Sequence, residues 1–159
     1  MRIDIPLTNR MPQPSKTRFQ TLASKWPALM DLIRLNRPIG VFLLLWPTLT
    51  ALWIAAEGWP GLKLLFIFSA GTFLMRSAGC CVNDFADTRY DGQVARTNQR
   101  PLVSGHLQRH DAFYFFLVLC SISFVLVSFT NRQTMWLALG AVIVAAIYPF
   151  MKRYTSLPQ

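Results

Sequence analysis

The residues best suited to chemistry lie between Arg76 and Asp91, where an apolar stretch gives way to a polar one. Three acids of this segment are Asp84, Asp87 and Asp91. If the segment is helical, a rotation of roughly 100° per residue places these acids, Arg76 and Asn83 within an arc of roughly 100°. Carboxylate and amide oxygens gathered on one face suit Mg²⁺, which takes its remaining ligands from water and substrate phosphates. The pattern predicts a metal site that holds a phosphorylated substrate.

The same acids have a second interpretation. At a solvated helix end they would pair with nearby arginines, and the sequence offers Arg89, Arg96 and Arg100. Arg76 favours the metal site, because a charge inside an apolar span costs roughly 2.5 to 3.5 kcal/mol and should face a polar cavity or a partner. The alternative for Arg76 is a side chain that reaches out to the membrane interface. Spacing alone leaves both alternatives open.

Further basic residues are candidates for binding phosphate oxygens. Arg96 and Arg100 follow the acids in a glycine-containing segment, and Lys152 and Arg153 follow the last apolar stretch. Arginine binds phosphate through two parallel N–H···O bonds. Basic residues beside an apolar span are also common as topological anchors, so their position is compatible with either role.

Four nearly uncharged stretches must position these side chains, and they cover residues 38–56, 64–83, 112–131 and 133–151. Each has about 20 residues, the length at which an α-helix crosses a bilayer core. Because 53% of the 159 residues are hydrophobic and only 14% are charged, too few polar residues remain to cover these helices in water. The sequence predicts an all-α bundle of four transmembrane helices.

The net charge of +9 has a distribution that predicts the orientation. Basic residues gather before residue 38, between residues 84 and 111, and after residue 151, whereas Lys63 and Arg132 occupy the other two connections. The positive-inside rule then places the N-terminus, the 84–111 connection and the C-terminal tail in the cytoplasm. Nucleic acid is excluded as a partner, because the basic residues flank the spans and form no single soluble face.

The chain before the first span has two parts. Residues 1–26 are polar and lack the apolar core of a signal peptide, so they are predicted to be a cytoplasmic segment. Residues 27–36 place apolar side chains on one side and Asp31 and Arg34 on another. This pattern predicts a short amphipathic helix along the membrane surface. Residues 27–159 are therefore treated as one transmembrane domain.

Several motifs give the chain a resemblance to a known family. Asn83, Asp87 and Asp91 match the Asn-x-x-x-Asp-x-x-x-Asp signature of the UbiA superfamily of intramembrane prenyltransferases. Segments 37–48, 79–84 and 148–155 are similar to the branch of this family that acts on 4-hydroxybenzoate. The resemblance runs from about residue 34 to the last residue, Gln159.

The resemblance implies transfer of a polyprenyl group from polyprenyl diphosphate to 4-hydroxybenzoate, at the ring carbon ortho to the hydroxyl. It implies a role in ubiquinone biosynthesis, a place in the bacterial inner membrane and a requirement for Mg²⁺. The residues implied to be catalytic are Asp87, Asp91 and Arg153. The candidate metal-binding residues are Asn83, Asp84, Asp87 and Asp91, although the family pattern assigns Asp84 no definite role.

The resemblance also suggests which residues bind the two substrates. Those implied to bind diphosphate are Arg96, Lys152 and Arg153. The candidates for other substrate contacts are Arg34, which suits the benzoate carboxylate, and Arg76.

The chain departs from the family pattern at several points. Asn36 stands where an aspartate is usual, and Val103 where a proline is usual. Family members have more spans and a second aspartate-rich motif in their later half. We therefore expect no turnover from these 159 residues alone. The alternative functions are a non-catalytic membrane remnant or scaffold, and a prenyltransferase with another acceptor.

Overall fold

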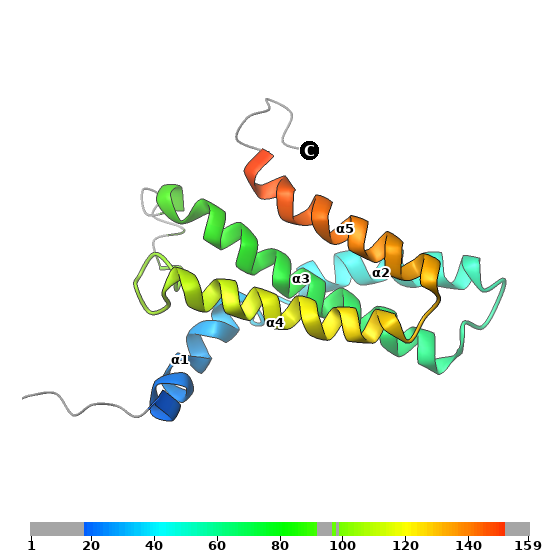
Figure 1. Cartoon of the computed structure of the whole chain (residues 1–159), viewed down its shortest axis with the longest axis horizontal. Helices are drawn as coiled ribbons and strands as arrows, with labels where there is room; N and C mark the ends of the chain where they lie inside the picture. The colour runs from blue at the N-terminus through cyan, green and yellow to red at the C-terminus, as the bar shows by residue number, and fades with distance from the viewer. Residues whose placement is uncertain (1–17, 92–96, 98, 152–159) are drawn as a thin grey trace, which may run out of the picture.

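The chain folds into five α-helices (Figure 1) in the part that the computed structural model describes, which is residues 18–91, 97 and 99–151. Within these residues, side chains are described for 24–88, 97, 99–149 and 151. The helices are α1 (Arg18–Leu32), α2 (Ile39–Ala55), α3 (Gly61–Asp91), α4 (Arg109–Ser128) and α5 (Arg132–Met151). No strand occurs among the described residues, and the predicted all-α fold is confirmed.

The predicted spans coincide with α2, α3, α4 and α5. By length and composition, two helices among the described residues are able to cross a membrane, namely Gly61–Thr88 of α3 and the whole of α4. α2 is apolar but, with 17 residues, is shorter than these two helices. α5 is not among the helices that meet both conditions. Four spans therefore remain a prediction. Within the most apolar 18 residues of each helix, only 28% of those of α3 and 11% of those of α4 are buried. Core helices of a soluble protein are mostly buried.

The outward faces of the helices are strongly apolar. On α2, Ile39, Leu43 and Trp46 are each about 70% exposed, and on α5 Leu137 and Val144 are similarly exposed. Covering apolar surface is favourable by about 25 cal/mol per Å² removed from water. Exposed apolar surface that extends along whole helices marks a membrane or protein contact, and here it fits lipid.

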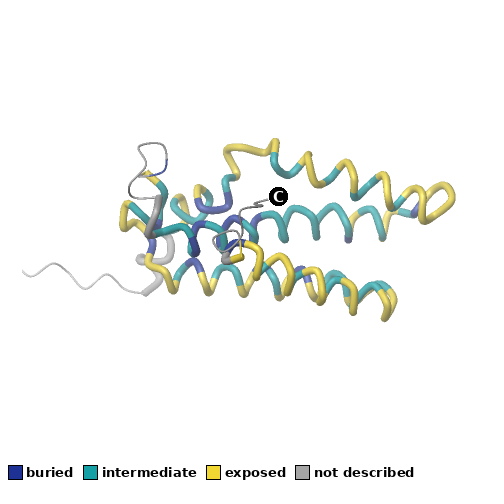
Figure 2. The backbone as a smooth tube through the Cα atoms, turned by 90° about the horizontal axis from the view of Figure 1, so that it is seen from above, coloured by how far each residue is buried: buried dark blue, intermediate teal, exposed yellow. Residues whose placement is uncertain are grey.

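α3 is the central element, because it contacts each of the other four helices. In Figure 1 the α2–α3 and α4–α5 connections lie at the right-hand end, whereas α3 ends and α4 begins at the left. Most buried positions in Figure 2 gather near this second end. The core there includes Leu32 of α1, Cys81 of α3, Leu107 of the α3–α4 connection and Leu119 of α4.

α3 continues beyond the predicted span 64–83 and ends at Asp91. The first part of the predicted 84–111 connection is therefore helical, which is the condition for a shared face of the acids. No glycine or proline interrupts the sequence between Asn83 and Gly92, so nothing local stops the helix. The acidic motif consequently lies on the rigid element that also crosses the bundle.

α1 differs from the predicted 27–36 helix, because it covers Arg18–Leu32 and contains Pro27. Arg34 has a left-handed φ of 56° and ends the helix. The Arg34 amide donates to the Asp31 carbonyl at 3.0 Å, and the Leu35 amide donates to the Met30 carbonyl at 3.2 Å. Such a pair of bonds closes a helix around a left-handed residue, which is most often glycine. The place of α1 at the membrane surface remains a prediction.

α1 is tied to the start of α4 by an ion pair. Lys25 Nζ donates to both carboxylate oxygens of Asp111, at 2.7 and 2.9 Å. The same carboxylate accepts a hydrogen bond from the Gln108 amide at 3.0 Å, which satisfies a donor at the N-terminus of α4. One acid thus fixes both the beginning of α4 and the position of α1.

The predicted orientation can be tested by labelling introduced cysteines, in a variant whose Cys80, Cys81 and Cys120 are replaced by alanine. Trp59→Cys and Arg132→Cys should react with a membrane-impermeant maleimide from the periplasmic side only. The reason is that Trp59 lies in the α2–α3 connection and Arg132 begins α5 after the α4–α5 connection, and these two connections have few basic residues.

Ser104→Cys, an exposed position in the α3–α4 connection, is the matched control and should react from the cytoplasmic side only. Labelling of all three cysteines from one side would rule out this topology.

Candidate functional site

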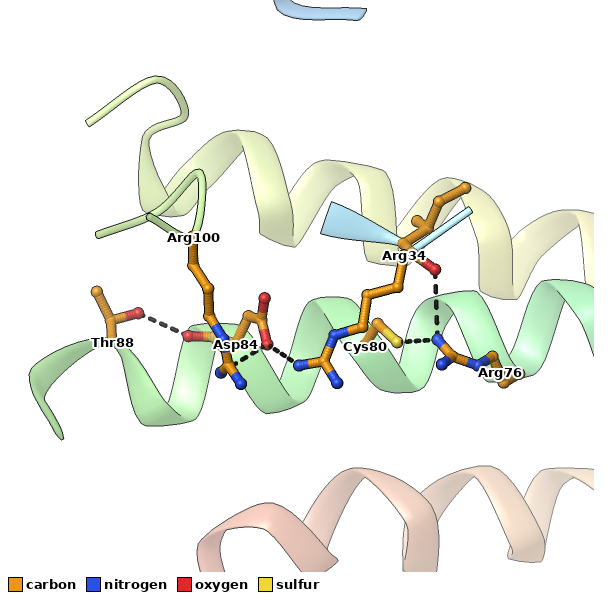
Figure 3. A network of polar contacts seen from close by, with 7 residues as sticks. Arg34, Arg76, Cys80, Asp84, Thr88 and Arg100 are labelled. Atoms are coloured by element: carbon orange, nitrogen blue, oxygen red, sulfur yellow. Dashed lines mark hydrogen bonds and ion pairs between the residues drawn. The ribbon is translucent and has the colours of Figure 1, made fainter. Parts of the chain in front are cut away.

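Asp84 is the centre of a polar network near the end of α3 (Figure 3). Its side chain is only 3% exposed. Asp84 Oδ1 accepts hydrogen bonds from Arg34 Nη2 at 2.9 Å and from Arg100 Nη1 at 3.1 Å. Arg34 precedes α2 and Arg100 follows α3, so one carboxylate joins three segments of the chain. The two guanidinium groups compensate a buried carboxylate that would otherwise cost several kcal/mol.

Neighbouring contacts hold this end of α3 in place. Arg109, the first residue of α4, places its guanidinium 4.4 Å from the centre of the Phe85 ring. Its Nη2 also donates to the Phe85 carbonyl at 3.3 Å. On the other side, Thr88 Oγ1 donates to the Asp84 carbonyl at 2.7 Å. The backbone around Asp84 is therefore anchored to α4 as well as to its own helix.

Arg76 lies about two turns before Asp84 on α3. Its Nη1 donates to the Ile33 carbonyl at 3.3 Å and contacts Cys80 Sγ. The guanidinium also lies against Gly40 of α2, where an added Cβ would be 2.6 Å from Arg76 Nη2. Arg76 therefore finds its partner inside the protein, at the connection between α1 and α2, and glycine at position 40 leaves room for it.

An open apolar cavity of about 950 Å³ lies beside Arg76. Four helices line it, with Leu44 from α2, Phe68 from α3, Leu117 from α4 and Val142 from α5. Its lining is mostly apolar, with a few Ser and Thr hydroxyl groups, while Arg76 supplies a cation. A cavity of this kind suits a long apolar ligand with an anionic group at one end.

The predicted metal ligands lie on α3. Asn83 and Asp87 are both partly exposed and one turn apart, and Asp91 is the last residue of the helix. The helix is continuous from Asn83 to Asp91, and this condition for a shared face of the motif is confirmed. The side chain of Asp91 lies outside the described part. Among the residues that the structure describes, no three His, Cys, Asp or Glu residues come together. The metal-binding roles of Asn83, Asp84, Asp87 and Asp91 remain predictions.

The other predicted site residues divide into two groups. Arg34 and Arg76 lie in the polar contacts around α3. The predicted diphosphate ligands lie outside the described residues, and they are Arg96, Lys152 and Arg153.

Arg100, which the sequence offered as a candidate for binding phosphate oxygens, enters the site as a partner of Asp84. Its pairing with an acid of the motif agrees with the second interpretation of these acids, except that the pair is buried rather than solvated. Arg34 and Asp84 are 50 positions apart, and no periodic pattern connects them.

Comparison with known proteins identifies the class to which this bundle and its motif belong. Residues 44–159 match the UbiA prenyltransferase family, which is most of the chain. The chain belongs to this family. No solved structure matches it.

The chain is similar to curated proteins named 4-hydroxybenzoate octaprenyltransferase. It is 59% identical over 130 residues to the protein of Pseudomonas syringae pv. tomato, a match that covers 82% of this chain and 44% of that protein. It is 56% identical over 146 residues to the protein of Pseudomonas aeruginosa, covering 90% of this chain and 49% of that protein. The chain thus spans about half the length of these relatives.

The close approach of Arg76 to Gly40 can be tested by thermal unfolding in detergent, followed by circular dichroism. Gly40→Ala should lower the melting temperature by an amount that corresponds to about 1 kcal/mol, because the new methyl group displaces the guanidinium from the Ile33 carbonyl. In an Arg76→Met background the same substitution should cost nothing, since alanine is otherwise favoured over glycine in a helix.

Gly140→Ala is the matched control, because a Cβ at this helical glycine would meet no atom within 4 Å. It should leave the melting temperature unchanged or raise it. Equal effects of Gly40→Ala in the two backgrounds would show that Arg76 is not what restricts position 40.

Proposed function

We propose that this chain is the N-terminal part of a membrane prenyltransferase that transfers a polyprenyl group from polyprenyl diphosphate to 4-hydroxybenzoate. The observation that carries the proposal is 56–59% identity to proteins named 4-hydroxybenzoate octaprenyltransferase. The enzyme would serve ubiquinone biosynthesis in the bacterial inner membrane, with its N-terminus in the cytoplasm. The exposed apolar faces of the helices support a location in the bilayer.

The donor set on α3 fits a magnesium ion. Asn83 offers an amide oxygen, and Asp87 and Asp91 offer carboxylates one and two turns further along the same helix. These are the oxygen ligands that Mg²⁺ prefers, and the few protein ligands leave room for phosphate oxygens. When bound, Mg²⁺ would supply positive charge that stabilises the departing pyrophosphate.

The remaining residues would bind the two substrates. The diphosphate would be held by Arg96, Lys152 and Arg153, whose fixed positive charges favour the leaving group. The apolar cavity beside Arg76 supports a place for the prenyl chain, because its wall comes from four apolar helices. Arg34 would receive the carboxylate of 4-hydroxybenzoate, since its guanidinium is partly exposed at the same end of α3.

The reaction then follows from the chemistry of the two substrates. The bond between the allylic carbon and the diphosphate oxygen breaks, and pyrophosphate leaves with the electron pair. The ring carbon ortho to the hydroxyl forms a new bond to the allylic carbon, and the ring loses a proton. The chain would contribute by holding the two substrates close together and in the reactive orientation. Such positioning supplies a large part of the rate enhancement in reactions of this kind.

The role of the motif can be tested in a fusion of this chain with the part of the Pseudomonas aeruginosa relative that it does not match. Prenylation of 4-hydroxybenzoate by this fusion should require Mg²⁺. Asp87→Ala should lower the rate by about 100-fold or more, because it removes a group that holds charge where pyrophosphate departs. Thin-layer chromatography with radiolabelled 4-hydroxybenzoate measures the product.

Asp31→Ala, which removes an exposed acid of α1, is the matched control and should retain the rate of the parent fusion. A fusion in which Asp87→Ala is equally active would refute the metal-binding role of this residue.

The 159-residue chain alone should give no product with 4-hydroxybenzoate, a long-chain prenyl diphosphate and Mg²⁺. The reason is that it spans about half of its relatives and leaves the apolar cavity open. Product above that of empty membranes would contradict this expectation. Absence of product from the fusion as well would favour a non-catalytic scaffold.

A further inference from the structure

Arg34 adopts a backbone conformation that its side chain does not favour. Its φ of 56° is left-handed, a conformation that is strained for a residue with a Cβ. Glycine commonly occupies this position at a helix end. An arginine here therefore needs a compensating interaction, and the 2.9 Å ion pair with buried Asp84 supplies one.

Arg100 is directed to the same carboxylate by the packing of its own segment. Leu102 and Leu107, which follow it, are buried in the core, and the Leu107 amide donates to the Pro101 carbonyl at 3.0 Å. These contacts fix the α3–α4 connection on both sides of a compact turn. Arg100 Nη1 then reaches the oxygen atom that Arg34 also contacts.

The resulting trio has one buried anion and two more accessible cations. The side chain of Asp84 is 3% exposed, whereas those of Arg34 and Arg100 are 37% and 25% exposed. Two positive groups and one negative group leave an excess of positive charge. Each guanidinium carries five N–H donors in a planar fork, the geometry that matches an oxyanion.

We infer that Asp84 is a positioning residue that holds Arg34 and Arg100 as a pair of cations for an oxyanion of the substrate. Arg100 thereby becomes a further substrate-binding residue. The inference rests on the proposed function, in which two oxyanions occur, the carboxylate of 4-hydroxybenzoate and the diphosphate of the prenyl donor. Both are recognised by the same chemistry, which is parallel N–H···O bonds from guanidinium groups.

This role differs from the metal-binding role considered for Asp84. Its Oδ1 already accepts two charge-assisted hydrogen bonds. Two guanidinium groups at this distance would also repel a divalent cation, and the repulsion is strong where water is excluded. Asn83 and Asp87 remain the better candidates for binding the metal, whereas Asp84 positions the two arginines.

Binding of the two oxyanions in the absence of metal tests the inference. The full 159-residue chain is placed in nanodiscs of uncharged lipid with EDTA, and its affinity for 4-hydroxybenzoate and, separately, for inorganic pyrophosphate is measured by calorimetry. The variants are Asp84→Asn, Asp84→Glu, Arg100→Gln and the double variant of Asp84→Asn with Arg100→Gln. Asp31→Asn is the matched control, because it removes an exposed acid near Arg34.

The inference predicts that Asp84→Asn binds at least one of the two anions about tenfold more weakly, because both guanidinium groups lose their anchor. Arg100→Gln should bind that anion more weakly as well. The double variant should be little worse than Asp84→Asn, since groups in one network do not act additively. Asp84→Glu should bind more tightly than Asp84→Asn, and Asp31→Asn should bind like the parent chain. The anion affected identifies the substrate that the pair holds.

The opposite result is the one that simple electrostatics predicts. Removing a negative charge without moving the arginines would strengthen anion binding, so unchanged or tighter binding by Asp84→Asn would overturn the inference. Failure of the parent chain to bind either anion would overturn it too. If Asp84→Asn loses its helical signal or melts far below the parent chain, Arg100→Gln decides, and normal anion binding by a folded Arg100→Gln variant overturns the inference.

The outcome is distinguishable from failure of the proposed function. Weaker metal-free binding by Asp84→Asn, together with full activity of an Asp87→Ala fusion, would support the arginine pair and refute the metal motif. Normal metal-free binding by Asp84→Asn, together with an inactive Asp87→Ala fusion, would refute the arginine pair and support the metal motif.

Discussion

A carboxylate buried at the end of a long apolar helix must be matched by cations, and the rest of this structure is arranged around that requirement. Asp84 lies on α3, the helix that contacts all the others, and is almost fully enclosed. Its partners come from the connection before α2 and from the connection after α3. Because a buried carboxylate without cations is costly, the two ion pairs hold both connections against α3.

The same principle explains Arg76. A guanidinium between apolar helices needs acceptors, and the free carbonyl of Ile33 near the end of α1 provides one. The lack of a side chain at Gly40 allows α2 to pass close to this cation. Arg76 and Asp84 thus anchor the same α1–α2 connection from two points along α3. Arg34, the left-handed residue of this connection, is held by its own bond to Asp84 and by the bond from Arg76 to the preceding residue, Ile33.

The distribution of apolar burial fits a protein that meets lipid on most sides. The core is confined to the end where α1, α3 and α4 meet, while α2 and α5 present large apolar side chains outward. In water such a surface would be unfavourable, whereas lipid solvates it. The open apolar cavity is lined by residues of α2, α3, α4 and α5.

The sequence by itself determined the all-α fold, the approximate position of every long helix, the family and the helical motif from Asn83 to Asp91. These depend on local composition and spacing, which a single chain displays directly. Sequence reasoning misplaced both ends of α1. The left-handed turn at Arg34, which closes its C-terminal end, is stabilised by a contact with Asp84 far along the chain. Only the tertiary structure brought Arg34 and Arg100 onto one oxygen of Asp84, because such pairings arise from the packing of distant segments and leave no periodic trace in the sequence.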